Sequence, residues 1–136
     1  MIGVASRVAG PPSRAATLAT LTLSLGFTVG CGMVNQDPRT VTLVARGMTF
    51  VLDDAPDTPN PVIPLRAGER VQLVLKNQAP GLLHDIQIPA WKVQVEQIRA
   101  GQSAEVIFTV PSAVGRYQYL CRPHSELMKG FVEVAP

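Results

Sequence analysis

The sequence predicts an all-β protein, a Greek-key β-sandwich or barrel of about eight short strands. Runs of alternating polar and apolar residues recur along residues 40–136, and turns that contain Gly or Pro separate them. No run has the apolar spacing of an amphipathic helix, and the chain has no internal repeat. Many short strands at close spacing favour two packed sheets over a helical fold.

The clearest strand is expected at residues 70–77, where Val71, Leu73 and Leu75 alternate with polar residues. Residues 91–98 are ambiguous, because Val93 and Val95 alternate but the segment also suits a helical turn. The other expected strands are residues 40–45, 48–52, 62–65, 86–88, 104–110, 116–120 and 129–134.

Residues 1–30 have the features of an export signal. Arg7 and Arg14 precede an uncharged stretch of small and apolar residues, 15–30. The apolar centre of this stretch is shorter than the roughly 20 residues that a spanning helix needs, and it ends in small residues, as a cleaved leader does. The sequence therefore predicts a leader at 1–30, a tether at 31–39 and one folded domain at 40–136.

The end of the leader, FTVGC at residues 27–31, resembles a bacterial lipobox. The resemblance implies that Cys31 is lipidated and becomes the first residue of the mature chain, which would anchor it to the membrane. An uncleaved anchor and a plain secretory signal are the alternatives. All three place the domain in the periplasm or at the extracellular face of the bacterial cytoplasmic membrane.

Charge argues against nucleic acid as a partner. Two of the twelve basic residues, Arg7 and Arg14, lie in the leader, and the remaining ten balance the ten acidic residues of the chain. The domain is therefore neutral and offers no basic surface for phosphate groups.

The chain has two cysteines, Cys31 and Cys121. If Cys31 is lipidated or removed, Cys121 is alone in an oxidising compartment, where an exposed thiol would be oxidised or mispaired. A thiolate bound to a metal is protected from oxidation and mispairing, which favours a metal-ligand role for Cys121. The simpler alternative is a buried, inert thiol.

The chemistry of the chain is concentrated between two expected strands. Cys121, His124 and Met128 lie on one short loop, and the one other histidine is His84. Two histidines and a cysteine with a distant axial methionine form the blue-copper electron-transfer site. The sequence therefore predicts one copper ion that cycles between Cu(I) and Cu(II), held by His84, Cys121, His124 and Met128. No histidine remains for a second centre, and Cys121 has no partner thiol in its loop for a binuclear one.

At these residues the chain resembles the cupredoxin family, of the plastocyanin and pseudoazurin kind, over residues 40–136. The resemblance rests on VQLVLKN at 71–77 ahead of His84, on GRYQYLC at 115–121, on Pro123-His124 and on MKG at 128–130. It implies a Greek-key sandwich with copper at one end, three strong ligands, and Met128 as a weak axial ligand.

Two features depart from the family pattern. Three residues separate His124 from Met128, a spacing that often differs in plastocyanin-like loops. Asp85 follows His84, where plastocyanins usually carry Asn. A carboxylate that faces the copper would stabilise Cu(II) and lower the redox potential.

The resulting hypothesis is a single-electron carrier and not an enzyme. The resemblance places His124 near the surface, so electrons are expected to pass through its edge to transient partners in a respiratory or other electron-transfer chain. The expected apolar rim around it consists of Leu82, Leu83, Pro123 and Leu127. The alternatives are a copper carrier or buffer in metal homeostasis, the copper domain of an oxidase or reductase, and a metal-free interaction module.

Overall fold

The computed structural model describes residues 37–136. The expected leader at 1–30, Cys31 and most of the expected tether lie outside the described residues. Arg39, the last residue assigned to the tether, already belongs to the first strand. No helix within residues 37–136 is long and apolar enough to span a membrane.

The described residues form nine strands and two single 3-10 turns. The turns, η1 and η2, are Pro89–Trp91 and Arg122–His124. The strands are β1 Arg39–Arg46, β2 Thr49–Leu52, β3 Val62–Arg66, β4 Arg70–Asn77, β5 His84–Ile88, β6 Val93–Ile98, β7 Ser103–Thr109, β8 Gly115–Leu120 and β9 Lys129–Ala135. This result confirms the predicted all-β class.

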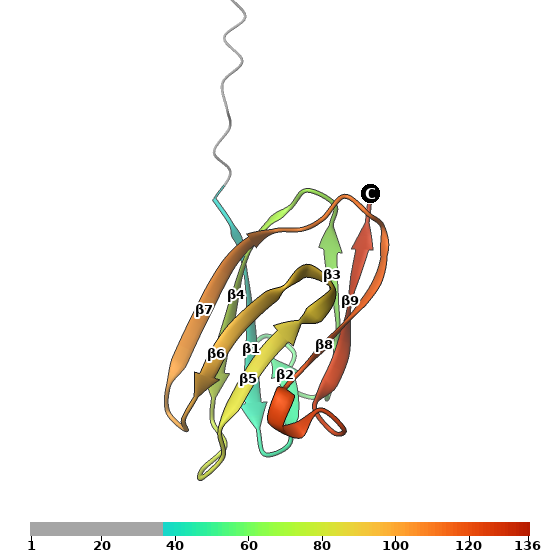
Figure 1. Ribbon diagram of the computed structural model, residues 1–136. Coiled ribbons are helices and arrows are strands. Elements are labelled where there is room, and N and C mark those ends of the chain that lie inside the picture. Colours follow the sequence, from blue (N-terminus) through green and yellow to red (C-terminus); the bar gives the residue numbers. More distant parts are fainter. Residues whose placement is uncertain (1–36) are drawn as a thin grey trace, which may run out of the picture. The chain divides into compact units, whose positions relative to one another are not determined.

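The strands build two sheets that pack as a sandwich (Figure 1). One sheet has the order β2-β1-β4-β7 and the other the order β3-β9-β8-β5-β6. The chain crosses between the sheets, so β1 pairs in parallel with β4, and β3 pairs in parallel with β9. The remaining strand pairs are antiparallel.

The core lies between the sheets and follows the alternation of the sequence. Val71, Leu73 and Leu75 of β4 are buried, and the residues between them are partly exposed. Because side chains alternate across a strand, one face of each sheet supplies this core while the other meets water. The predicted alternation in β4 is therefore confirmed.

The ambiguous segment at 91–98 divides into a turn and a strand. Pro89 opens η1, and Lys92 ends it in the left-handed region with φ 54°. The chain then continues as β6, which pairs with β5. Trp91 stays in the turn and packs against Tyr117, with ring centroids 5.0 Å apart. This extra strand explains why nine are present.

Candidate metal centre

The start of β5 and the end of β8 lie at the same end of the sandwich (Figure 1). Three side chains meet there. His84 is the first residue of β5, Cys121 directly follows β8, and His124 closes η2. One donor atom from each side chain lies within 4.8 Å of the others. The fold therefore brings together His84 and Cys121, which are 37 positions apart in sequence.

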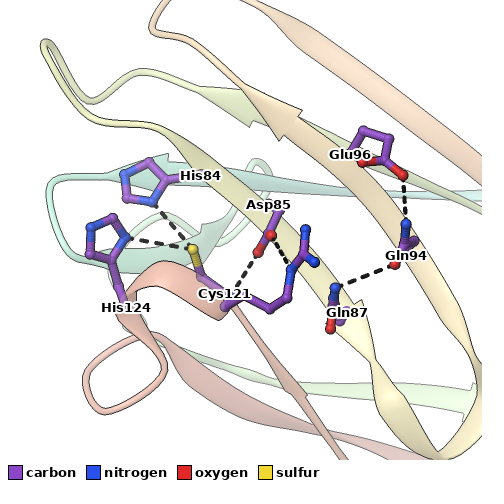
Figure 2. Close-up of polar contacts among 8 residues, drawn as sticks. His84, Asp85, Gln87, Gln94, Glu96, Cys121 and His124 are labelled. Atoms are coloured by element: carbon purple, nitrogen blue, oxygen red, sulfur yellow. Dashed lines mark hydrogen bonds and ion pairs between the residues drawn. The ribbon is translucent and has the colours of Figure 1, made fainter.

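Both imidazoles present the same atom to the sulfur. The Nδ1 atoms of His84 and His124 each lie 3.6 Å from Cys121 Sγ (Figure 2). The two rings stand beside each other, with centroids 4.9 Å apart and planes inclined by 56°. Three donor atoms thus converge on one small space.

These distances fit one metal ion in a trigonal plane. Metal–nitrogen bonds of about 2.0 Å and metal–thiolate bonds of about 2.3 Å, opened to 120°, separate nitrogen from sulfur by about 3.7 Å. The observed separations of 3.6 Å match this value. Thiolate and imidazole donors suit copper, which prefers soft ligands.

Burial sets the protonation of the donors. Burial lowers the pKa of His84, and the neighbouring His124 lowers it further, so the imidazole is neutral at neutral pH. Burial also raises the pKa of the Cys121 thiol, so without a metal the sulfur keeps its proton. A metal binds neutral imidazole and thiolate, and its binding therefore displaces the thiol proton.

Residues 121–128, here called the 121–128 loop, fold back on themselves. The Cys121 amide donates to the Met128 carbonyl at 2.9 Å, and the Met128 amide donates to the His124 carbonyl at 2.9 Å. The Met128 side chain is fully buried. The backbone of this methionine is therefore fixed next to Cys121.

The loop that leads to His84 is ordered by Asn77, a buried residue at the end of β4. Its Nδ2 atom donates to the carbonyls of Leu82, at 2.9 Å, and Ile98, at 3.0 Å. Its Oδ1 atom accepts from the Ala79 amide at 2.9 Å. One amide side chain thus shapes the turn from which β5 and His84 emerge. Sequence reasoning included Asn77 only as part of a strand.

Two further residues hold the 121–128 loop and were not predicted to do so. Asp85 Oδ1 accepts from the Arg122 amide at 2.7 Å (Figure 2). Asn60 Nδ2 donates to the Leu127 carbonyl at 3.0 Å. The loop is therefore held near both ends by side chains from other parts of the fold. The turn-like sequence around Asn60 was the one available signal.

Three of the four residues expected to form an apolar rim are exposed in the structure. Leu83 and Leu127 are 43% and 61% exposed, and His124 itself is partly buried. Pro123 is also exposed, whereas Leu82 is partly buried. Met48 is 40% exposed and was not among the expected rim residues. It follows Gly47, whose backbone raises the pKa of His84.

Similar folds occur among solved structures of auracyanins. Auracyanin from Roseiflexus castenholzii, in its dithionite-reduced form, aligns with a TM-score of 0.58 at 19% identity, covering 74% of this chain and 100% of that one. Auracyanin B aligns with a TM-score of 0.58 at 25% identity, covering 76% and 94%. Auracyanin A, a "blue" copper protein from Chloroflexus aurantiacus, aligns with a TM-score of 0.54 at 21% identity, covering 73% and 100%. No curated protein sequence matches this chain.

A family model provides the link by sequence. The model of copper-binding proteins of the plastocyanin/azurin family matches residues 67–135. That stretch is half of the chain and includes His84, Cys121, His124 and Met128. Together with the converging donor atoms, this match shows that the chain belongs to the plastocyanin/azurin family of copper-binding proteins.

Proposed function

We propose that this protein carries single electrons on one copper ion bound by His84, Cys121 and His124, with Met128 as the weak axial ligand. The observation that carries the proposal is the pair of Nδ1 atoms, each 3.6 Å from the same buried sulfur. Copper, when bound, supplies the one-electron change between Cu(II) and Cu(I). The copper of auracyanin A, a "blue" copper protein of similar fold, supports this function.

The chain's contribution is to keep the donors in place. Cys121 and His84 are fully buried at the ends of paired strands. The backbone hydrogen bonds within the 121–128 loop restrict its movement further. Donors that stay in place leave little to rearrange when an electron arrives or leaves, which favours fast transfer.

The transfer route that we propose is the exposed edge of His124. This imidazole is partly buried, whereas His84 is fully buried, and the expected rim residues Leu83, Pro123 and Leu127 are exposed. Small apolar contact areas suit brief encounters with redox partners, which often bury less than about 1,200 Å². The balanced charge of the domain predicts that ionic strength has little effect on the transfer rate. A steep fall in rate with salt would contradict this docking mode.

Anchoring at the bacterial cell envelope through Cys31 remains part of the proposal. The lipobox-like stretch at 27–31 supports it. Expression in a bacterial host should place the wild-type chain in the membrane fraction and Cys31→Ala outside it. Recovery of both forms in the same fraction would argue against the lipid anchor.

A visible spectrum of the copper-loaded protein tests the central claim. Strong absorption at about 600 nm from the thiolate–copper bond is expected. Cys121→Ala should abolish it, whereas Met128→Leu should keep the colour and change the redox potential. A colourless wild-type protein with copper bound would overturn the proposal.

A copper carrier or buffer is the alternative that shares these residues. It differs because it must release its metal readily, whereas an electron carrier keeps the metal through many cycles. Repeated reduction and oxidation in the presence of a copper chelator distinguishes the two. The electron carrier retains its blue colour under this treatment, and a buffer loses it. An enzyme is disfavoured because the two histidines of the chain are both used by one copper ion.

A further inference from the structure

Asp85 is a buried carboxylate directed at the 121–128 loop. It follows His84 on β5, and its side chain is 1% exposed. Oδ1 accepts from the Arg122 amide at 2.7 Å, and Oδ2 accepts from Arg122 Nε at 2.9 Å (Figure 2). Arg122 therefore donates a hydrogen bond to each carboxylate oxygen, one from its backbone amide and one from its guanidinium group.

The two oxygens have different consequences. The bond from Oδ1 fixes the backbone directly after Cys121 and needs an acceptor but no charge. The bond from Oδ2 pairs a negative charge with a positive one, and a buried carboxylate without such a partner is strongly unfavourable. Position and charge can therefore be separated by substitution.

The charge of Asp85 lies beside the metal donors. Asp85 directly follows His84, and its carboxylate accepts a hydrogen bond from the amide of Arg122, the residue directly after Cys121. A negative charge at this place favours the more positive oxidation state of a metal bound there. Arg122 opposes this effect with the opposite charge.

The two partners differ in exposure. The Asp85 side chain is 1% exposed and that of Arg122 is 56% exposed. Water screens the guanidinium group more than the carboxylate. The carboxylate charge next to the sulfur is therefore moderated by a partner that is accessible from solvent.

We propose that Asp85 and Arg122 are positioning residues that fix the 121–128 loop and set the redox potential by cancelling each other's charge. The inference rests on the proposed copper function and adds a determinant outside the ligand set. The exposed Arg122 keeps the potential higher than a lone carboxylate beside His84 would allow.

The test compares midpoint potentials of copper-loaded variants at neutral pH by spectroelectrochemistry. Arg122→Gln leaves the carboxylate unpaired and should shift the Cu(II)/Cu(I) equilibrium at least tenfold toward Cu(II), which equals 59 mV for one electron. Asp85→Asn keeps an oxygen for the Arg122 amide but removes the charge, so its potential should rise. The double variant should fall between the two single variants, and Arg122→Lys should stay close to wild type.

Asp85→Ala separates position from charge, because it also removes the acceptor for the Arg122 amide. In NMR spectra of the copper-free proteins, we expect the amide signals of the 121–128 loop to be broadened in Asp85→Ala and unchanged in Asp85→Asn. Thermal unfolding of each copper-free variant checks folding. If Arg122→Gln does not fold, the upward shift of Asp85→Asn carries the test.

Single variants that shift the potential in the same direction, or by less than tenfold, would overturn the charge role while the wild-type protein remains blue. A wild-type protein without the blue absorption would instead overturn the proposed function itself. The two failures are therefore distinguishable in one set of samples.

Discussion

The Asn60 side chain connects the segment between β2 and β3 to the 121–128 loop, because its Nδ2 atom donates to the Leu127 carbonyl at 3.0 Å. Asn60 also forms two hydrogen bonds with the backbone of Phe50. Asn60 Oδ1 accepts from the Phe50 amide at 3.0 Å, and the Asn60 amide donates to the Phe50 carbonyl at 2.7 Å. Asn60 therefore joins the edge strand of one sheet to the metal-binding end.

Asn60→Ala should destabilise the copper-free protein by about 2–3 kcal/mol. Two side-chain hydrogen bonds are lost, at about 1 kcal/mol each. In addition Asn60 has φ 46°, a conformation that Asn tolerates better than Ala. Urea unfolding followed by fluorescence measures the difference.

Two other substitutions at this position separate the contributions. Asn60→Gly removes both side-chain bonds but accepts the backbone conformation, so it should be more stable than Asn60→Ala. Asn60→Asp keeps the acceptor for the Phe50 amide and loses the donor to Leu127. Equal stability of all three variants and wild type would show that the connection is unimportant.

Gly130 and Tyr119 form a close contact that excludes any larger side chain. A Cβ atom at residue 130 would lie 2.3 Å from Tyr119 Oη and 2.4 Å from its Cζ atom. The ring cannot move freely, because it is fully buried and its hydroxyl donates to the Pro61 carbonyl at 2.7 Å. Gly130→Ala should therefore lower the free energy of unfolding by about 2–3 kcal/mol.

Tyr119→Phe is the matched control for that contact. It removes the hydroxyl and its hydrogen bond, at about 1–2 kcal/mol, but leaves the ring in place. Adding Gly130→Ala to Tyr119→Phe should still be destabilising, because the Cζ atom alone is too close. A double variant as stable as Tyr119→Phe would contradict the steric argument. Chemical denaturation of the copper-free proteins gives all four values.

Copper binding should weaken as the pH falls. The pKa of the Cys121 thiol is raised by burial, so below that pKa each copper that binds releases one proton. The apparent affinity should thus increase about tenfold per pH unit. Competition with a chelator at several pH values, corrected for the chelator's own protonation, measures this slope. A flat profile would mean that the sulfur binds as a thiolate that is already formed.

The ion pair of Glu69 with Arg39 should matter at neutral pH and not in acid. Hydrogen bonding from Arg39 is the largest cause that lowers the pKa of Glu69 below 4.5. A carboxylate with a lowered folded pKa stabilises the fold above its unfolded pKa, and this stabilisation is lost as pH falls through the folded value. Glu69→Gln should therefore cost about 1 kcal/mol at pH 7 and nothing at strongly acidic pH.

Glu133 provides the control for this comparison. Its carboxylate lies 4.0 Å from Arg116, and both side chains are more than half exposed. Glu133→Gln should change stability by less than about 0.5 kcal/mol at any pH. If thermal unfolding shows the same pH profile for both variants, the contribution of Glu69 is not specific.

Much of the fold could be predicted, because apolar residues recur at every second position in a strand that has one buried face. Val71, Leu73 and Leu75 reveal β4 by their spacing alone. Residues 91–98 could not be assigned, since Trp91 packs on Tyr117 from a turn and not from a strand. That contact depends on β8, a partner distant in sequence.

The candidate metal donors could be predicted because few residue types can bind copper, and the chain has few of them. The supporting residues could not. Asn60 and Asp85 form hydrogen bonds with backbone atoms of the 121–128 loop. Every residue has the same backbone atoms, so the sequence does not indicate which of them a side chain will bind. The direction of the Asp85 carboxylate depends on the fold. In the structure it forms an ion pair with Arg122, whose positive charge opposes the lowering of the redox potential expected from a carboxylate at this position.

The parallel pairing of β3 with β9 has a consequence for biogenesis. Val62–Arg66 finds its neighbour only in Lys129–Ala135, and β8 depends on that same strand. Contacts between such distant segments form slowly and late. A nascent chain therefore cannot complete this pairing until residue 135 has been synthesised, so we expect the metal-binding end to form only after β9 is in place.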